Sequence, residues 1–232
     1  AATESIDWSG IKGIVLLNHG ILTFGDDAKT SYDSMINLVD TAEKFLLSKM
    51  DEHTIAKVDA SITEQDCLQL TELRRRAGEF FEGPVLVRLN SSDTAVGFSA
   101  LGNFEDLITR GPLTPDHTIH TKAFGAAFHF NPSLELENFR DRYEKYFVNH
   151  ASEGLQMLDL MPRFGAWHKK GLVYFSGNVK RLNVVESIVG HTIKAIQLSE
   201  AIGGWCALPK DKLFEVEYWE LEQAKLKTNK AN

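Results

Sequence analysis

A pattern of strand, turn, strand and helix near the N-terminus most constrains how this chain folds. Two short apolar runs, 14–17 and 21–24, are separated by Gly20, and Gly25 follows the second run. Short runs of β-branched and aliphatic residues bounded by glycine predict two strands, the first of them buried. Asp26 and Asp27 then offer side chains that cap a helix start. Apolar residues recur at helical spacing behind them, which predicts an amphipathic helix over about residues 28–49.

The same alternation of strands and helices continues along the chain. Ser61 and Glu64 have the spacing of a capping box, and the leucines behind them predict a helix over about residues 63–79. A turn-forming cluster at 90–93 separates two further apolar runs. Strands are predicted at 84–89, 94–98 and 171–175, and helices at about 135–149 and 185–202. This alternation is typical of an α/β protein with three layers, α/β/α, around a mixed sheet.

Two stretches of the chain resemble each other at an offset of 151 residues. Gly20 aligns with Gly171, and Phe24 aligns with Phe175. Each stretch has a strand, a turn with glycine and a helix of about twenty residues. This similarity predicts an internal repeat, so that the chain would hold the end of one unit and most of a second. Chance similarity between two strand–helix units is the competing interpretation.

Composition excludes several classes of protein. The 232 residues include 25 Lys and Arg against 32 Asp and Glu, a net charge of -7, which argues against a nucleic-acid-binding surface. No apolar stretch approaches the roughly 18 to 20 residues needed to span a bilayer, so no membrane association is expected. Cys67 and Cys206 are the only cysteines, which excludes a disulfide framework and a thiol-rich zinc site. The N-terminal residues have no secretory signal pattern, and we expect a cytoplasmic protein.

Two groups of residues are candidates for chemistry. His19 ends a predicted strand and precedes Gly20, a position that suits a zinc ligand, although the pattern alone favours a histidine that is satisfied by a backbone carbonyl. His117 and His120 are three residues apart, with Lys122 close behind. If Thr114 and Pro115 start a helix there, this segment could hold a phosphate. A polar loop that caps a helix is the alternative.

Several segments resemble a known family. Residues 13–25 and the helix end at 40–46 resemble the C-terminal part of the class II aldolase/adducin family. Residues 111–117, 190–193 and 214–226 resemble the segment that follows the aldolase domain in bifunctional aldolase/short-chain dehydrogenase proteins of the rhamnulose-phosphate aldolase type. The resemblance implies a class II aldolase-like fold and this division: 1–50 the remnant of one unit, 51–83 a helical connection, 84–227 a second, degenerate unit and 228–232 a linker.

The resemblance also implies a chemistry. Members of the family bind zinc or another divalent metal and cleave a phosphorylated sugar, such as rhamnulose or fuculose 1-phosphate, in a retro-aldol reaction. His19 matches one of their metal-binding histidines, but the His-x-His pair and the acid/base glutamate have no counterpart in front of it. Lys170 stands at the corresponding place in the second unit, which would therefore be degenerate. The catalytic residues are thus unknown. The metal is expected in the parent enzyme, and the chain alone is expected to be inactive unless neighbouring subunits supply the missing groups.

A different class of function stays open. The chain could be a non-catalytic module that links an aldolase to a dehydrogenase or builds an oligomer interface. The expected partners are a small phosphorylated sugar, for the aldolase, and further copies of the chain in a homo-oligomer. The apolar residues Tyr218 and Trp219 predict that the C-terminal tail docks on the folded body or on a neighbouring subunit, because burying each side chain contributes roughly 1.5 to 3 kcal/mol.

Overall fold

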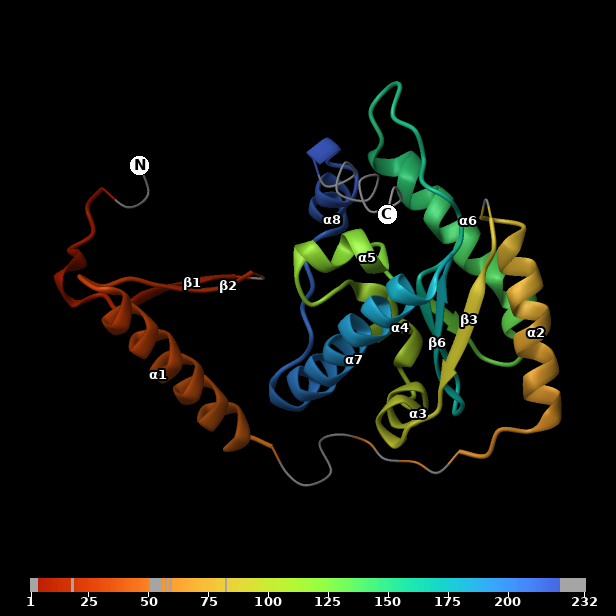
Figure 1. Ribbon diagram of the computed structural model, residues 1–232, viewed down its shortest axis with the longest axis horizontal. Coiled ribbons are helices and arrows are strands. Elements are labelled where there is room, and N and C mark those ends of the chain that lie inside the picture. The colour runs from red at the N-terminus through yellow and green to blue at the C-terminus, as the bar shows by residue number, and fades with distance from the viewer. Residues whose placement is uncertain are drawn as a thin grey trace. The chain divides into compact units, whose positions relative to one another are not determined.

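The chain divides into two compact units. The structure is a computed structural model that describes residues 4–17, 19–50, 56, 58, 60–81 and 83–221. Unit 1 is Ala1–Asp51 and unit 2 is Glu52–Asn232. Figure 1 labels the elements of both units, which are described separately below. In the described part of the chain, no helix combines the length and the apolarity needed to cross a membrane.

Unit 1 contains a β-hairpin followed by a long helix. After the short helix η1 (Trp8–Gly10), β1 (Gly13–Leu16) and β2 (Gly20–Thr23) pair antiparallel, and α1 spans Ala28–Leu47. The Asp27 side chain accepts a hydrogen bond from the Thr30 amide at 2.8 Å and so caps α1, as the sequence predicts. The Thr23 hydroxyl donates to the Ser31 carbonyl at 2.9 Å, which ties the helix to the hairpin.

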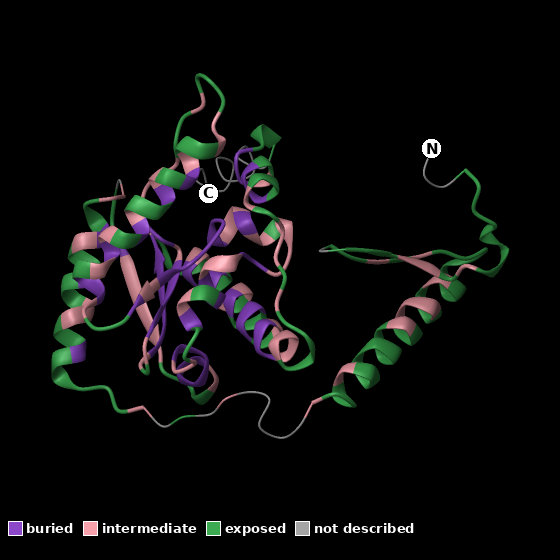
Figure 2. Cartoon of the chain, turned by 180° about the vertical axis from the view of Figure 1, so that it is seen from behind, coloured by how far each residue is buried: buried purple, intermediate pink, exposed green. Residues whose placement is uncertain are grey.

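The apolar side chains of unit 1 are largely exposed to solvent. Val15 is 68% exposed and Leu17 is 87% exposed, so the prediction of a buried first strand is wrong within unit 1. Helix α1 has no buried residue. Figure 2 shows the hairpin and α1 in the colours of exposed and intermediate residues only. The physical reason is that one hairpin and one helix offer too little surface to enclose a core.

Unit 2 is built around a four-stranded mixed sheet. Its strands are β3 (Leu86–Asn90), β4 (Ala126–Phe128), β5 (Phe164–Trp167) and β6 (Gly171–Ser176), in the order β3-β6-β5-β4. β6 is antiparallel to β3 and to β5, whereas β4 is parallel to β5. Gly171, with φ of 122°, lies so close to β3 that a Cβ atom would be 2.0 Å from the Asn90 carbonyl oxygen. A residue with a side chain would therefore separate β6 from β3.

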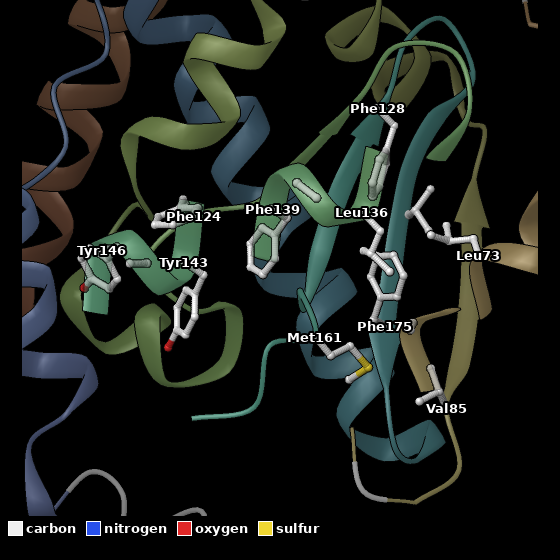
Figure 3. Packing of buried hydrophobic residues seen from close by; sticks show 14 of the residues in the cluster. Leu73, Val85, Phe124, Phe128, Leu136, Phe139, Tyr143, Tyr146, Met161 and Phe175 are labelled. Carbon is white, nitrogen blue, oxygen red and sulfur yellow. The ribbon is translucent and has the colours of Figure 1, made fainter. Parts of the chain in front are cut away.

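Helices cover both faces of this sheet. Val173 and Phe175 of β6 belong to a core with α2 (Glu64–Gly78), α6 (Pro132–His150) and α8 (Lys210–Glu217). Leu172 and Tyr174 belong to a second core with α3 (Asp93–Ser99), α4 (Phe104–Arg110) and α7 (Val179–Ile202). Figure 3 shows Leu73 of α2 and Leu136 of α6 packed near Phe175. The predicted mixed α/β fold is thus confirmed, and alternation along β6 explains why two helical layers are needed.

Two local predictions differ from the structure. Residues 94–98, predicted as a strand, lie in helix α3. The capping box of α2 joins Thr63 and Asp66 instead of Ser61 and Glu64, with the Asp66 amide 3.2 Å from the Thr63 hydroxyl and the Thr63 amide 2.8 Å from the Asp66 carboxylate. The turn-forming residues before α3 serve as a helix start, because the short polar side chains that favour turns also favour helix N-termini.

The hairpin and helix of unit 1 have a counterpart with the same spacing in unit 2. β1 and β5 begin 151 residues apart, as do β2 and β6, and α1 and α7. The pairing register also corresponds, since Leu16 pairs with Gly20 and Trp167 pairs with Gly171. The two hairpins belong to different sheets, one of two strands and one of four. Within unit 2 the four-stranded sheet buries the hairpin, which explains the difference in exposure from unit 1.

The described part of the C-terminal tail docks on unit 2 through one aromatic residue. Tyr218 is buried, and its ring stacks on Phe214 with the centroids 4.4 Å apart. Trp219 is 53% exposed, so the predicted docking holds on this body for Tyr218 and not for Trp219. Residues 222–232, which include the expected linker at 228–232, lie outside the described residues.

Candidate functional site

His19 lies in the turn of the unit 1 hairpin. Its amide donates to the Leu16 carbonyl at 3.1 Å, and its side chain is exposed. Among the described residues, no three His, Cys, Asp or Glu side chains gather closely enough to hold a metal ion. Zinc sites use about three to four protein ligands. The described residues therefore do not fit a metal by themselves, and His19 remains a single candidate ligand.

Lys170 occupies the same turn position in the unit 2 hairpin. Its amide donates to the Trp167 carbonyl at 2.9 Å, which repeats the bond made by His19. Its ammonium group donates to the Asp66 carboxylate at 2.8 Å and to the Ser61 carbonyl at 3.1 Å. Lys170 therefore anchors the start of α2 to the hairpin, which is a structural role at the position where unit 1 has an imidazole.

The predicted segment around His117 and His120 is helical. Pro115 begins a short 3-10 helix, η2 (Pro115–His117), which continues into α5 (Thr118–Thr121). This agrees with the predicted helix start at Thr114 and Pro115. His117 is half-buried, and burial and the neighbouring His120 lower the pKa of its imidazole. His120 lines a cavity described below.

Lys122 does not line that cavity, and its side chain is buried in the protein. It is 3% exposed, and its ammonium group donates to the Asp159 carbonyl and lies 3.9 Å from the centre of the Tyr143 ring. Its backbone has a φ of 62°, an uncommon conformation for a residue with a side chain. Burial, together with the charge of Arg163, lowers the pKa of Lys122 to about 7, against the attraction of Asp159.

A buried carboxyl group lies close to Lys122. Glu217 of α8 is 1% exposed, and the Tyr143 hydroxyl donates to its carboxylate at 2.9 Å. The Tyr143 and Tyr218 hydroxyls are also 2.9 Å apart. Burial raises the pKa of Glu217 to about 7, although Lys122 and the tyrosine hydrogen bonds act in the opposite direction. These groups attach α8 to α6 through polar contacts inside the first core.

A small cavity lies where β6 passes into α7. Its volume is about 40 Å³. Its polar lining comes from His120 of α5, Arg163 before β5, Ser176 at the end of β6 and Arg181 in the first turn of α7. Apolar side chains of Phe81, Ile119, Met161 and Val185 complete the wall. We call this cavity the arginine pocket.

Neighbouring side chains hold the guanidinium group of Arg163 and the backbone of Arg181. Asp159 accepts two hydrogen bonds from the Arg163 guanidinium, at 2.8 and 2.6 Å. Burial raises the pKa of Asp159, but the hydrogen bonds and charge of Arg163 outweigh this effect and lower it overall. The Arg181 amide donates to the capping side chain of Asn178 at 2.9 Å. Burial, and then the charge of Arg163, lowers the pKa of the Arg181 guanidinium.

The sequence analysis missed three of the four polar residues of the arginine pocket. Only His120 was singled out, whereas Arg163, Ser176 and Arg181 were not. One sequence signal could have predicted Ser176 and Arg181. The predicted strand at 171–175 is followed by Ser176 and Gly177 and then by a helix start, and a helix N-terminus next to the end of a strand is a common ligand site. Arg163 had no such local signal, because only the pairing of β5 with β6 brings it there.

Comparison with known proteins identifies the family. Residues 64–226 match the sequence profile of the family described as aldolase class II, second domain. The chain belongs to this family. The match begins at α2 and includes all four strands of unit 2 and the arginine pocket.

The chain is also similar to part of a longer protein. The uncharacterized oxidoreductase YuxG of Bacillus subtilis (strain 168) is 22% identical over 232 aligned residues. The alignment covers 92% of this chain and 33% of that protein, so the chain spans about a third of the relative's length. The uncovered part of this chain is smaller than unit 1, so the similarity extends into unit 1 as well.

Proposed function

We propose that this chain is part of a metal-dependent class II aldolase that cleaves a phosphorylated sugar such as rhamnulose or fuculose 1-phosphate. In this proposal, unit 1 ends a metal-binding aldolase unit to which His19 contributes, and unit 2 is a degenerate copy of that unit. The full protein would also carry a short-chain dehydrogenase. The reaction is a retro-aldol cleavage, and residues outside this sequence would supply the remaining metal ligands and the acid/base group.

One observation carries this proposal: two hairpin–helix motifs 151 residues apart place His19 and Lys170 at the same turn position. In a chain with an aldolase second domain, a shared register and a shared turn bond support descent from one repeated unit. Lys170 forms an ion pair with Asp66. This contact supports the proposal that unit 2 kept its fold although it has no metal ligand at this turn position. The relative's length leaves room for further domains.

A second candidate is a non-catalytic module that links an aldolase to a dehydrogenase or builds an oligomer interface. The exposed apolar surface of unit 1 favours this candidate, because contiguous apolar surface often marks a contact with another protein segment. The absence of a three-ligand metal cluster from the described residues is compatible with both candidates.

Activity assays separate the two candidates. The chain 1–232 should not cleave rhamnulose or fuculose 1-phosphate with added zinc, because a single imidazole does not fix a metal. The full-length natural protein should cleave one of them, and H19A should abolish that cleavage. The matched control H191A removes an exposed imidazole of α7 and should keep the activity.

Two results would contradict the proposal. If the full-length protein cleaves neither sugar phosphate while it binds zinc, the linking module becomes the better explanation. If the chain 1–232 alone cleaves the substrate and loses this activity in H19A, the missing ligands lie within this sequence. His117 and His120 would then be the first residues to substitute.

A further inference from the structure

The arginine pocket brings hydrogen-bond donors from separate parts of the chain to one small cavity. Arg163 and Arg181 each offer a guanidinium group, His120 offers an imidazole and Ser176 offers a hydroxyl group. The Asn178 amide donates to the Ser176 oxygen at 3.3 Å, which leaves the Ser176 hydroxyl hydrogen able to turn toward the cavity. Burial and the charge of Arg163 lower the pKa of Arg181 although Asp159 pairs with Arg163, so an anion in the cavity would stabilise the charged form of Arg181.

The size of the cavity selects among anions. A water molecule needs about 10 to 15 Å³, so a cavity of about 40 Å³ has room for a small group but not for a large one. The three terminal oxygens of a phosphate monoester need a similar space. A sugar ring does not fit there, so it would have to lie outside the mouth of the pocket.

The chemistry of the lining favours phosphate. Guanidinium groups bind phosphate oxygens through pairs of parallel hydrogen bonds. The pocket also lies against the first turns of α7, a helix of 24 residues whose N-terminus carries partial positive charge. The apolar side chains of the wall lower the polarity of the cavity and so strengthen these electrostatic interactions.

The pocket is organised before a ligand arrives. Asp159 holds Arg163 through two hydrogen bonds, and Asn178 fixes the first turn of α7 and with it the backbone of Arg181. Ser176 is buried at the end of β6, in the middle of the sheet. The Arg163 side chain therefore has little freedom left to lose on binding, which favours affinity.

We propose that the arginine pocket binds a phosphate group, either as the end of a sugar phosphate or as inorganic phosphate. The assignment of the sugar phosphate as substrate rests on the proposed function, whereas phosphate recognition follows from the pocket alone. Asp159 acts as a positioning residue for Arg163, because it contacts the guanidinium and does not line the cavity.

Binding to the chain 1–232 tests this inference without any catalysis. Calorimetry at constant ionic strength would compare inorganic phosphate, rhamnulose 1-phosphate, unphosphorylated rhamnulose and chloride. Phosphate and the sugar phosphate should bind, and the free sugar and chloride should not. R181Q should weaken phosphate binding about tenfold or more, because a hydrogen bond to a charged group is lost. R181K should be intermediate, since it keeps the charge without the paired hydrogen bonds.

The control K194Q removes one positive charge from an exposed position of the same helix and should bind phosphate like the unaltered chain. Circular dichroism of R181Q would check that it folds, and S176A offers a second pocket variant without a charge change. Tighter binding of rhamnulose 1-phosphate than of phosphate supports the substrate as the source, and the reverse supports free phosphate. Absence of phosphate binding, or equal binding by folded R181Q and the unaltered chain, would overturn the inference whatever the aldolase assays show.

Discussion

Glu217 and Lys122 are ionisable residues at the centre of a hydrophobic core. Burial raises the pKa of the Glu217 carboxyl from 4.5 to about 7 and lowers the pKa of the Lys122 ammonium from 10.5 to about 7. Between pH 4.5 and about 7, the folded protein holds the Glu217 proton more tightly than the unfolded chain does. Glu217 therefore lowers the stability as pH rises through that window, and Lys122 raises it again as pH increases further.

Replacing Glu217 with Gln should change this pH dependence. E217Q keeps a neutral hydrogen-bonding side chain, so it should lose less stability than the unaltered chain as pH rises from about 5 to about 8. The difference between the Tm of E217Q and the Tm of the unaltered chain should therefore increase by several degrees, in favour of E217Q, across this pH range. The control E215Q, an exposed position of the same helix that pairs with Lys212, should keep the original pH slope. Parallel curves for E217Q and the unaltered chain would contradict a raised pKa.

Phe175 is a second residue at which burial determines the outcome. It is 0% exposed in the core between β6 and the helices α2 and α6. F175A should lower the free energy of unfolding by about 3 to 5 kcal/mol, since it removes apolar contacts and leaves a cavity. F130A, at an aromatic residue that is 83% exposed, should change it by about 0.5 kcal/mol or less. Urea denaturation of both variants measures the difference, and similar losses would mean that Phe130 packs against something in solution.

At the scale of single elements, the start of α2 joins a local cap to a long-range contact. Thr63 and Asp66 form the capping box, and Asp66 also binds the Lys170 ammonium from the β5–β6 turn at 2.8 Å. Asp66 therefore both caps the start of α2 and binds the turn between β5 and β6. The sequence predicted the box two residues earlier because Ser61 and Glu64 have the same spacing and suitable side chains.

The two alternative boxes can be distinguished by paired substitutions. T63A should lower the free energy of unfolding by about 1 kcal/mol, because it removes the hydroxyl that accepts the Asp66 amide. S61A should have little effect, since only the Ser61 backbone carbonyl takes part in the contact with Lys170. Thermal or urea unfolding measures both, and a larger loss for S61A would place the cap at the residue the sequence favoured.

At the scale of the whole molecule, the two units differ in how much they bury. Unit 2 contains two hydrophobic cores, whereas α1 of unit 1 has no buried residue. Local opening costs little free energy where few apolar contacts are lost. Unit 2 should therefore account for the cooperative unfolding of this chain.

Hydrogen exchange should separate the units. The amides of α1 should exchange much faster than those of α7, although both helices are long and begin with a side-chain cap. A chain of residues 52–232 should keep the thermal midpoint of the longer chain, because unit 2 holds both cores. Mass spectrometry of deuterium uptake measures the first expectation. Protection of α1 equal to that of α7 would mean that the apolar side of unit 1 is covered in solution, as in the expected homo-oligomer.

The sequence by itself determined the features that depend on local interactions. Apolar periodicity placed two strands near the N-terminus and the four longest helices, and short polar side chains placed the cap of α1. Sequence predicts these features because the residues of one helix face or one strand face recur every few positions along the chain. The same signals failed at α3, where a short apolar run suits either a strand or a helix and the packing against the sheet decided.

Only the tertiary structure decided the burial of the strands and the composition of the site. The hairpin of unit 1 is exposed and the hairpin of unit 2 is buried, because burial depends on the elements that pack around a strand. The arginine pocket joins His120, Arg163, Ser176 and Arg181. Sequence spacing predicts which residues share one helix face or one strand. This cavity instead depends on the order of β5 and β6 in the sheet and on the packing of α5 against α7.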